Sequence, residues 1–120
     1  MTERAMEMAS VAVHALEDRK GTDIKVIDIS EVSVVADCFI IASGGNERQL
    51  NAMADSVEES LEKAGKPMRH KEGRGENKWI LLDFHDVVIH IFDREMREYY
   101  DLERIWRDGK AVEIGRDQSA

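Results

Sequence analysis

Residues 79–106 decide the fold and read W-I-L-L-D-F-H-D-V-V-I-H-I-F-D-R-E-M-R-E-Y-Y-D-L-E-R-I-W. Within them, Trp79–Asp83 and Val87–Phe92 are apolar runs rich in the β-branched and aromatic residues that favour strands. Only residues 84–86 separate the two runs. Because so short a connection cannot cross over a sheet, we expect the two strands to pair as an antiparallel hairpin.

A charged, aromatic helix is expected to follow the hairpin. Asp93 is suited to cap it, and the helix should run towards Trp106 with a break near Asp101. Leu102, Ile105 and Trp106 continue an apolar helical stripe, which indicates packing on the core.

The chain before residue 79 alternates between helical and strand patterns. Asn46, followed three residues later by Gln49, is typical of the start of a helix. Two glycines among the charges of residues 72–78 predict a mobile loop. The predicted elements are a helix over 1–19, strands over 24–29 and 36–43, a helix opening at Asn46, and a short strand over 68–71.

These elements predict an α/β fold of the mixed, α+β kind, with helices packed on a five-stranded mixed sheet. A chain of 120 residues is long enough for one core, so we expect a single domain over 1–120. Residues 108–120 offer little to bury except Val112 and Ile114, which predicts a weakly ordered tail.

Charge and composition narrow the classes of function. The formal net charge of −8 disfavours wrapping a nucleic-acid backbone and suits a basic protein partner. No apolar run approaches the roughly 20 residues of a membrane span, so we expect a cytoplasmic protein without a membrane partner. The single Cys38 excludes an internal disulfide and is interpreted as a small buried hydrophobe.

The strongest candidate for chemistry is the turn Ser43–Asn46, S-G-G-N, between a buried strand and a capped helix. Backbone amides and the helix dipole at such a turn can hold a phosphate. The turn lacks the spacings of the lysine-containing phosphate loop and of the dinucleotide fingerprint. A strand-to-helix turn that needs glycine is the simpler interpretation, and a nucleotide-binding protein or metal-dependent nucleotidyltransferase is the alternative.

Nucleotidyl transfer requires paired carboxylates that hold two metal ions. The strand that should supply them carries Arg69, His70 and Lys71 instead. Asp83 and Asp86 are interpreted as turn and strand-end residues. We therefore predict no catalytic residue, no metal site and no cofactor, and a protein that is not an enzyme.

His90 lies in V-V-I-H-I-F, on the sheet face opposite Val87, Ile89 and Ile91. Zinc-binding motifs are absent from the sequence, so a hydrogen-bonded structural histidine is the favoured interpretation. A histidine that faces a partner is the alternative.

Three aromatic residues suggest a surface for a protein partner. Phe84 occupies a hairpin corner between polar residues, which indicates a contact site or a lid over the core. A patch of Trp79, Phe84 and Tyr100 would suit a protein partner, although burial is equally compatible with Trp79.

Several separated motifs carry a resemblance to a known family. They are A-D-C-F-I-I-A-S-G at 36–44, R-Q at 48–49, A-D-S-V at 54–57, and the hairpin and helix of 79–106. In order and spacing they resemble the Iojap or RsfS family, the ribosomal silencing factors. The turn F-H-D departs from the family, which often has a glycine before the aspartate, so His85 can change the turn's shape.

The resemblance implies a nucleotidyltransferase-like fold without the catalytic residues of the transferases. It also implies that the protein binds the large ribosomal subunit through ribosomal protein L fourteen, blocks joining of the small subunit and represses translation when nutrients are scarce. No sequence-specific contact with nucleic acid is expected.

By the same resemblance, the partner-binding residues are Trp79, Phe84 and Tyr100, with Asp86 and Arg97 at the rim. The resemblance implies a homodimer of the free protein as well, because an apolar patch left without its partner tends to self-associate. A dimeric adaptor with a different protein target is a third possibility.

Overall fold

A six-stranded mixed sheet forms the centre of the computed structural model, which describes residues 1–114. The strand order is β3-β4-β5-β2-β1-β6; β2 and β5 are parallel and the other neighbours antiparallel. The elements are α1 (Glu3–Asp18), β1 (Thr22–Asp28), β2 (Cys38–Gly44), α2 (Glu47–Lys63), β3 (His70–Arg74), η1 (Gly75–Asn77), β4 (Trp79–Asp83), β5 (Val87–Asp93), α3 (Arg94–Tyr100), α4 (Leu102–Ile105) and β6 (Lys110–Val112).

The predicted α/β class with a mixed sheet is confirmed, but the expected count of five strands is wrong. The sixth strand, β6, lies in the segment predicted as a weakly ordered tail. It pairs with the end of β1, and Ile114 just after it is only 8% exposed. The few apolar residues of this segment are therefore enough to close the sheet edge. The predicted tail residues 115–120 lie outside the described part of the chain.

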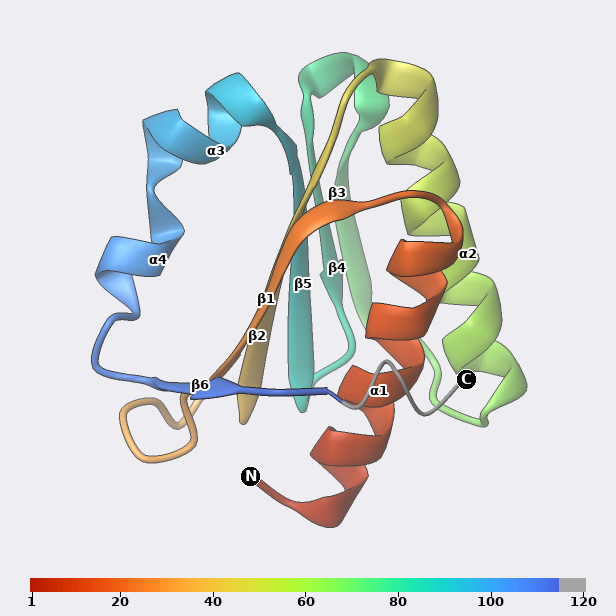
Figure 1. Ribbon diagram of the computed structural model, residues 1–120. Coiled ribbons are helices and arrows are strands. Elements are labelled where there is room, and N and C mark those ends of the chain that lie inside the picture. The colour runs from red at the N-terminus through yellow and green to blue at the C-terminus, as the bar shows by residue number, and fades with distance from the viewer. Residues whose placement is uncertain (115–120) are drawn as a thin grey trace.

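The two faces of the sheet are covered differently. The long helices α1 and α2 pack on one face, and the short helices α3 and α4 lie on the other (Figure 1). Residues alternate between the faces along β5: Val87, Ile89 and Ile91 point into the α1/α2 core, whereas Val88 and Phe92 join the smaller cluster on the opposite face. The α3/α4 face is thus the thinner layer of the molecule.

Local signals explain where the two long helices begin. Thr2 caps α1 by accepting a hydrogen bond from the Ala5 amide, and Asn46 caps α2 by accepting one from the Gln49 amide at 2.8 Å. The capping pattern at Asn46 is therefore confirmed in its first half. The Gln49 side chain does not return to Asn46; its Oε1 accepts from the Gly45 amide instead.

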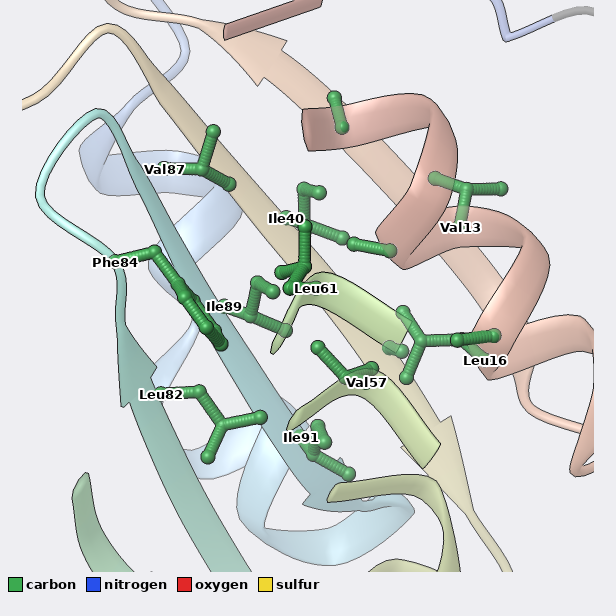
Figure 2. Packing of buried hydrophobic residues seen from close by; sticks show 14 of the residues in the cluster. Val13, Leu16, Ile40, Val57, Leu61, Leu82, Phe84, Val87, Ile89 and Ile91 are labelled. Atoms are coloured by element: carbon green, nitrogen blue, oxygen red, sulfur yellow. The ribbon is translucent and has the colours of Figure 1, made fainter. Parts of the chain in front are cut away.

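The hairpin corner between β4 and β5 differs from expectation. Phe84 is only 3% exposed and belongs to the main core, so of the two expected roles, a contact site or a lid over the core, burial favours the second. Phe84 follows Ile80 and Leu82 at two-residue steps, which directs its ring to the helix-covered face. Figure 2 shows it pointing into the same interior as Leu82 and Leu61. His85 takes the turn instead, with a φ of 76° in the left-handed region that a glycine adopts without strain.

The predicted mobile loop over 72–78 is wrong, because most of it has regular structure. Strand β3 continues to Arg74, and η1 follows directly. The Asn77 side chain accepts a hydrogen bond from the Arg74 amide, and Asn51 on α2 accepts one from the Gly75 amide. The first contact joins the end of β3 to η1, and the second attaches η1 to α2.

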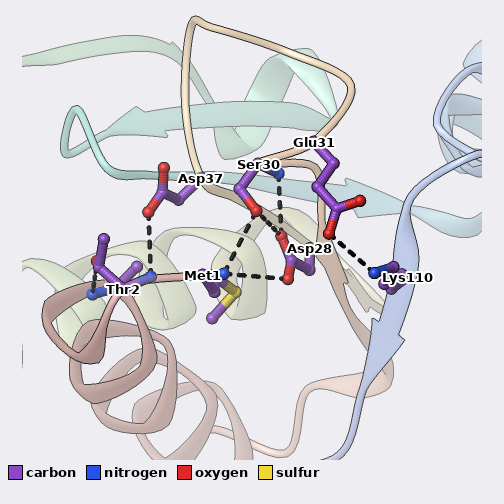
Figure 3. A network of polar contacts seen from close by, with 8 residues as sticks. Met1, Thr2, Asp28, Ser30, Glu31, Asp37 and Lys110 are labelled. Atoms are coloured by element: carbon purple, nitrogen blue, oxygen red, sulfur yellow. Dashed lines mark hydrogen bonds and ion pairs between the residues drawn. The ribbon is translucent and has the colours of Figure 1, made fainter.

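A polar network joins the chain's first residues to the far end of the sheet (Figure 3). The amino group of Met1 contacts Asp28 and the Ser30 hydroxyl, each at 3.3 Å, and the Thr2 amide donates to Asp37. A hydrogen bond from the Ser30 hydroxyl lowers the pKa of the Asp28 carboxyl. The network fixes the start of α1 against the loop between β1 and β2.

Candidate partner-binding surface

An almost continuous run of aromatic rings lies on the α3/α4 face of the sheet. Ring centroids are 4.9 Å apart between Trp106 and Phe39, and 5.2 Å apart between Phe39 and His90. The run continues from His90 to Phe92 at 5.7 Å and from Phe92 to Tyr100 at 5.8 Å. We call these five rings, together with Trp79, the aromatic face.

Strand register explains the run. Trp79 on β4 is opposite Phe92 on β5, and His90 is opposite Leu81 on one side and Ile41 on the other. Because every second residue of each strand points to this face, neighbouring strands place rings beside one another. Helices α3 and α4 cover this layer only in part, and Trp79 and Leu81 are left half-buried.

A hollow of about 160 Å³ opens in the aromatic face where α3 meets α4. Tyr100, at the end of α3, is 49% exposed, and the preceding Tyr99 is 77% exposed. The residues that line the hollow are Trp79, His90, Phe92, Tyr100 and Leu102. Rings with one apolar side and one polar end are the side chains that contribute most to protein–protein contacts.

His90 at the floor of the hollow is a structural histidine, as the sequence indicated. Its Nδ1 accepts a hydrogen bond from Trp79 Nε1 at 3.3 Å. Burial lowers the pKa of His90 from 6.5 to about 4, so the ring is neutral at physiological pH. A neutral acceptor is what the indole N–H requires, and the bond fixes the orientation of Trp79.

We expect His90 to make the fold less stable in mild acid. In the unfolded chain the imidazole binds a proton near pH 6.5, whereas in the folded chain it does so only near pH 4. The contribution is therefore complete above pH 6.5 and decreases as the pH falls towards 4, by about 3 kcal/mol in total. Urea unfolding of the wild type and of His90→Gln, between pH 7 and 5, measures it.

Glutamine keeps an acceptor for Trp79 but does not titrate. The free energy of unfolding of His90→Gln should therefore vary less over this range than that of the wild type. Equal pH dependence in the two proteins would show that His90 is not the responsible group.

Of the five predicted partner-binding residues, the structure brings Trp79 and Tyr100 together at the hollow. Phe84 is in the main core beneath α1 and α2 and cannot contact a partner directly. Asp86 is at the opposite end of the hairpin from Trp79 and forms an ion pair with Arg4 of α1 at 2.9 Å. The expectation that Asp86 borders the same patch is therefore wrong.

The rim role predicted for Arg97 is also wrong, because its side chain is inside the molecule. Arg97 is only 6% exposed and binds Glu103, Ser43 and Asp23. The hydrogen bond from Arg97 is the main cause that lowers the pKa of the Glu103 carboxyl. Arg97 therefore connects α3, α4 and the sheet.

Phe39, Phe92 and Leu102 belong to this layer but were not predicted as part of it, and for His90 a partner-facing position was only the alternative interpretation. The two-residue alternation along β4 and β5 already predicts that Trp79 and Phe92 share one face. That pattern does not predict how much of this face the two short helices α3 and α4 leave uncovered.

In the turn Ser43–Asn46, the alternative site, polar groups are already hydrogen-bonded within the protein. Gln49 Oε1 accepts from the Gly45 amide at 2.6 Å, and Gln49 Nε2 donates to the carbonyls of Arg19 and Lys20. The Ser43 hydroxyl accepts from Arg97. An amide that would face a phosphate is thus already bonded, which supports the simpler interpretation of a tight turn.

Other candidate groups have structural surroundings. Cys38 is fully buried, and burial raises the pKa of its thiol to about 12, as suits a small core residue. Within residues 1–114, no group of three or more histidine, cysteine or carboxylate side chains is placed to hold a metal ion. Over the same residues, no helix has the length and apolar character needed to span a membrane.

The fold and this surface describe a small mixed α/β protein with a half-exposed aromatic sheet face. A family model described as "Ribosomal silencing factor during starvation" matches residues 2–120. The chain belongs to this family, the ribosomal silencing factors.

Individual relatives agree with the family match. The ribosomal silencing factor RsfS of Halalkalibacterium halodurans is 33% identical over 108 residues, covering 90% of this chain and 92% of that protein. RsfS of Chromobacterium violaceum is 39% identical over 100 residues, covering 83% and 82%. A crystal structure of a Chromobacterium violaceum protein, 36% identical, has a TM-score of 0.83 and covers 95% of this chain and 92% of that chain.

Proposed function

We propose that this protein binds the large ribosomal subunit through ribosomal protein L fourteen and sterically blocks joining of the small subunit. Translation would thereby be repressed when nutrients are limited. The proposal includes a cytoplasmic location, which the subunits require. Membership of the silencing-factor family supports the ribosome as the partner.

The observation that carries the proposal is the half-exposed pair Trp79 and Tyr100 around an apolar hollow. Trp and Tyr are the side chains most often found at the energetic centre of protein interfaces. The hollow offers space for an apolar side chain of a partner, and the surrounding rings exclude water from such a contact.

The charge of the chain supports a basic partner. With a net charge of −8, the protein attracts a basic ribosomal protein and is repelled by exposed stretches of ribosomal RNA backbone. Long-range attraction mainly speeds association, so the association rate should fall as salt is added.

The mechanism needs no chemical step. A bound body with a radius of gyration of 13.0 Å occupies space on the subunit face. If this face meets the small subunit, joining is blocked for as long as the protein stays bound. The duration of silencing is then set by the dissociation rate.

In the absence of ribosomes, we propose that the aromatic face pairs with a second copy of the chain. An apolar patch of this kind gains free energy from self-association, and a two-fold dimer uses the same patch on both copies. Light scattering over a concentration series tests this proposal. If the protein is a monomer at all concentrations, the dimer is rejected, and the proposal of ribosome binding is unchanged.

Gradient sedimentation with purified subunits tests the proposed function. We expect the protein to migrate with large subunits and not with small ones, and to reduce the fraction of joined ribosomes when added before mixing. Unchanged joining, or failure to migrate with large subunits at low salt, would reject the proposal. If large subunits that lack ribosomal protein L fourteen still bind the protein, the proposed contact with that ribosomal protein is wrong. The proposal that the protein binds the large subunit would stand.

A further inference from the structure

Tyr100 and Leu102, which form one side of the hollow, flank a sharp change in chain direction. Helix α3 ends at Tyr100, Asp101 adopts a φ of 48° and a ψ of 50°, and α4 begins at Leu102. Asp101 is not glycine, so this left-handed conformation is strained unless other contacts hold it. Helices of 7 and 4 residues are too short to be stable by themselves.

Arg97 and Glu103 close this corner from the inside. Arg97 Nε and Nη2 donate to the two carboxylate oxygens of Glu103, each at 3.2 Å. This two-pronged contact has a fixed geometry, because both groups are planar. It joins α3 to α4 across the five residues that include Tyr100 and Leu102.

The same guanidinium attaches the corner to the sheet. Arg97 Nη1 donates to the Ser43 hydroxyl of β2 at 2.8 Å, and Nη2 is 3.6 Å from the Asp23 carboxylate of β1. The Lys25 ammonium of β1 lies 3.4 Å from the Glu103 carboxylate and forms a further ion pair between the corner and the sheet. Ser43 is itself buried and fixed by its place in β2, so the corner is positioned relative to the strands that carry the other rings.

We propose that Arg97 is a positioning residue for the partner-binding surface: its clasp on Glu103 and Ser43 holds Tyr100 and Leu102 at the hollow. This inference rests on the proposed function, because it assigns the shape of the same surface. Arg97 is buried and acts through the two side chains that the corner presents. Without the clasp, α3 and α4 would sample other orientations, and only the fraction of molecules with a formed hollow would bind.

The direct test is Arg97→Met, which keeps an unbranched apolar side chain in the buried site but removes the guanidinium donors. We expect the affinity for large subunits, measured by sedimentation, to fall about tenfold, as follows if about one molecule in ten keeps the formed surface. Arg104→Met is the matched control: Arg104 lies on the same corner, but its side chain is exposed and pairs with the exposed Asp101. It should change the affinity by less than about twofold.

A coupling measurement separates positioning from general destabilisation. The Tyr100→Ala, Leu102→Ala double variant lacks the two side chains that Arg97 is proposed to position. Adding Arg97→Met to it should therefore change the remaining affinity by less than about twofold. An equal loss in both backgrounds would reject the positioning role. Low salt keeps the weak binding of the background measurable.

A second readout does not need ribosomes. With Trp106→Phe, Trp79 is the only tryptophan, and quenching of its fluorescence by acrylamide reports whether the hollow is covered. We expect Arg97→Met to increase quenching and Arg104→Met to leave it unchanged. If the wild type fails to bind large subunits, the proposed function is wrong, and this readout still decides whether the clasp shapes the hollow.

Unchanged affinity or unchanged quenching in a folded Arg97→Met protein would overturn the inference. If Arg97→Met does not fold, Glu103→Gln takes its place, because it keeps the shape of the side chain and removes the charge. For this variant we expect a smaller loss of affinity in the same direction, and no loss would again overturn the inference.

Discussion

Replacing Phe84 by alanine is expected to lower the free energy of unfolding by about 3–5 kcal/mol, because the ring is buried in the main core and its removal leaves a cavity. A domain of this size has a total stability of only about 5–15 kcal/mol. Urea denaturation followed by circular dichroism measures the change. Affinity for large subunits, counted per folded molecule, should stay the same, because the ring is on the face opposite the hollow.

Tyr99→Ala is the matched control for stability, since Tyr99 is an aromatic residue of similar size that is mostly exposed. It should change the free energy of unfolding by less than about 0.5 kcal/mol. A loss below about 1 kcal/mol for Phe84→Ala would show that the ring is not packed as described. Weakened binding by folded Phe84→Ala molecules, with stability unchanged, would return Phe84 to the partner surface.

Phe84 shows why local sequence was not enough to predict this site. Its polar neighbours Asp83 and His85 left two interpretations open, a contact site or a lid over the core. The direction of the ring is set by strand alternation, which places residue 84 on the same face as Leu82. His85 takes the left-handed backbone position, so the polar turn forms around a buried ring.

The fold was largely predictable because its signals are local. Caps at Thr2, Asn46 and Asp93 and the short hairpin connection fix where elements begin and which strands pair. Strand β6 was missed because a run of three residues has almost no periodicity. Its pairing depends on the exposed edge of β1, which is a tertiary property.

The proposed partner surface was predictable only in part, for a related reason. Trp79 and Tyr100 are 21 positions apart, and a hollow between them exists only because α3 and α4 fold back over β5. Arg97 is charged and lies in a helix rich in charges, so the sequence favours an exposed side chain. Its burial depends on Glu103 of α4, Ser43 of β2 and Asp23 of β1, which only the tertiary fold brings together.

The two faces of the sheet therefore have different roles. One is closed by two long helices and supplies most of the buried apolar surface. The other carries rings that contact one another but are only partly covered, so it keeps apolar surface exposed. Because the scaffold is on one side and the proposed contact surface on the other, substitutions on the two sides should affect different measurements.

Trp79→Ala is expected to have the largest effect on binding, with a loss of affinity for large subunits of about 100-fold. Truncation of a central tryptophan in an interface typically removes 2 kcal/mol or more, and each 1.4 kcal/mol corresponds to about a tenfold change in affinity. Trp79 also donates to His90, so the free energy of unfolding has to be measured in parallel and the affinity counted per folded molecule. Trp79→Phe keeps an aromatic ring in the hollow but loses the donor, and it should retain more affinity than alanine.

The matched control is Trp106→Phe, because Trp106 is in the same aromatic run but does not line the hollow. If folded Trp79→Ala binds with an affinity within about threefold of the wild type, the partner surface lies elsewhere, because removal of a ring at the centre of an interface should weaken binding far more.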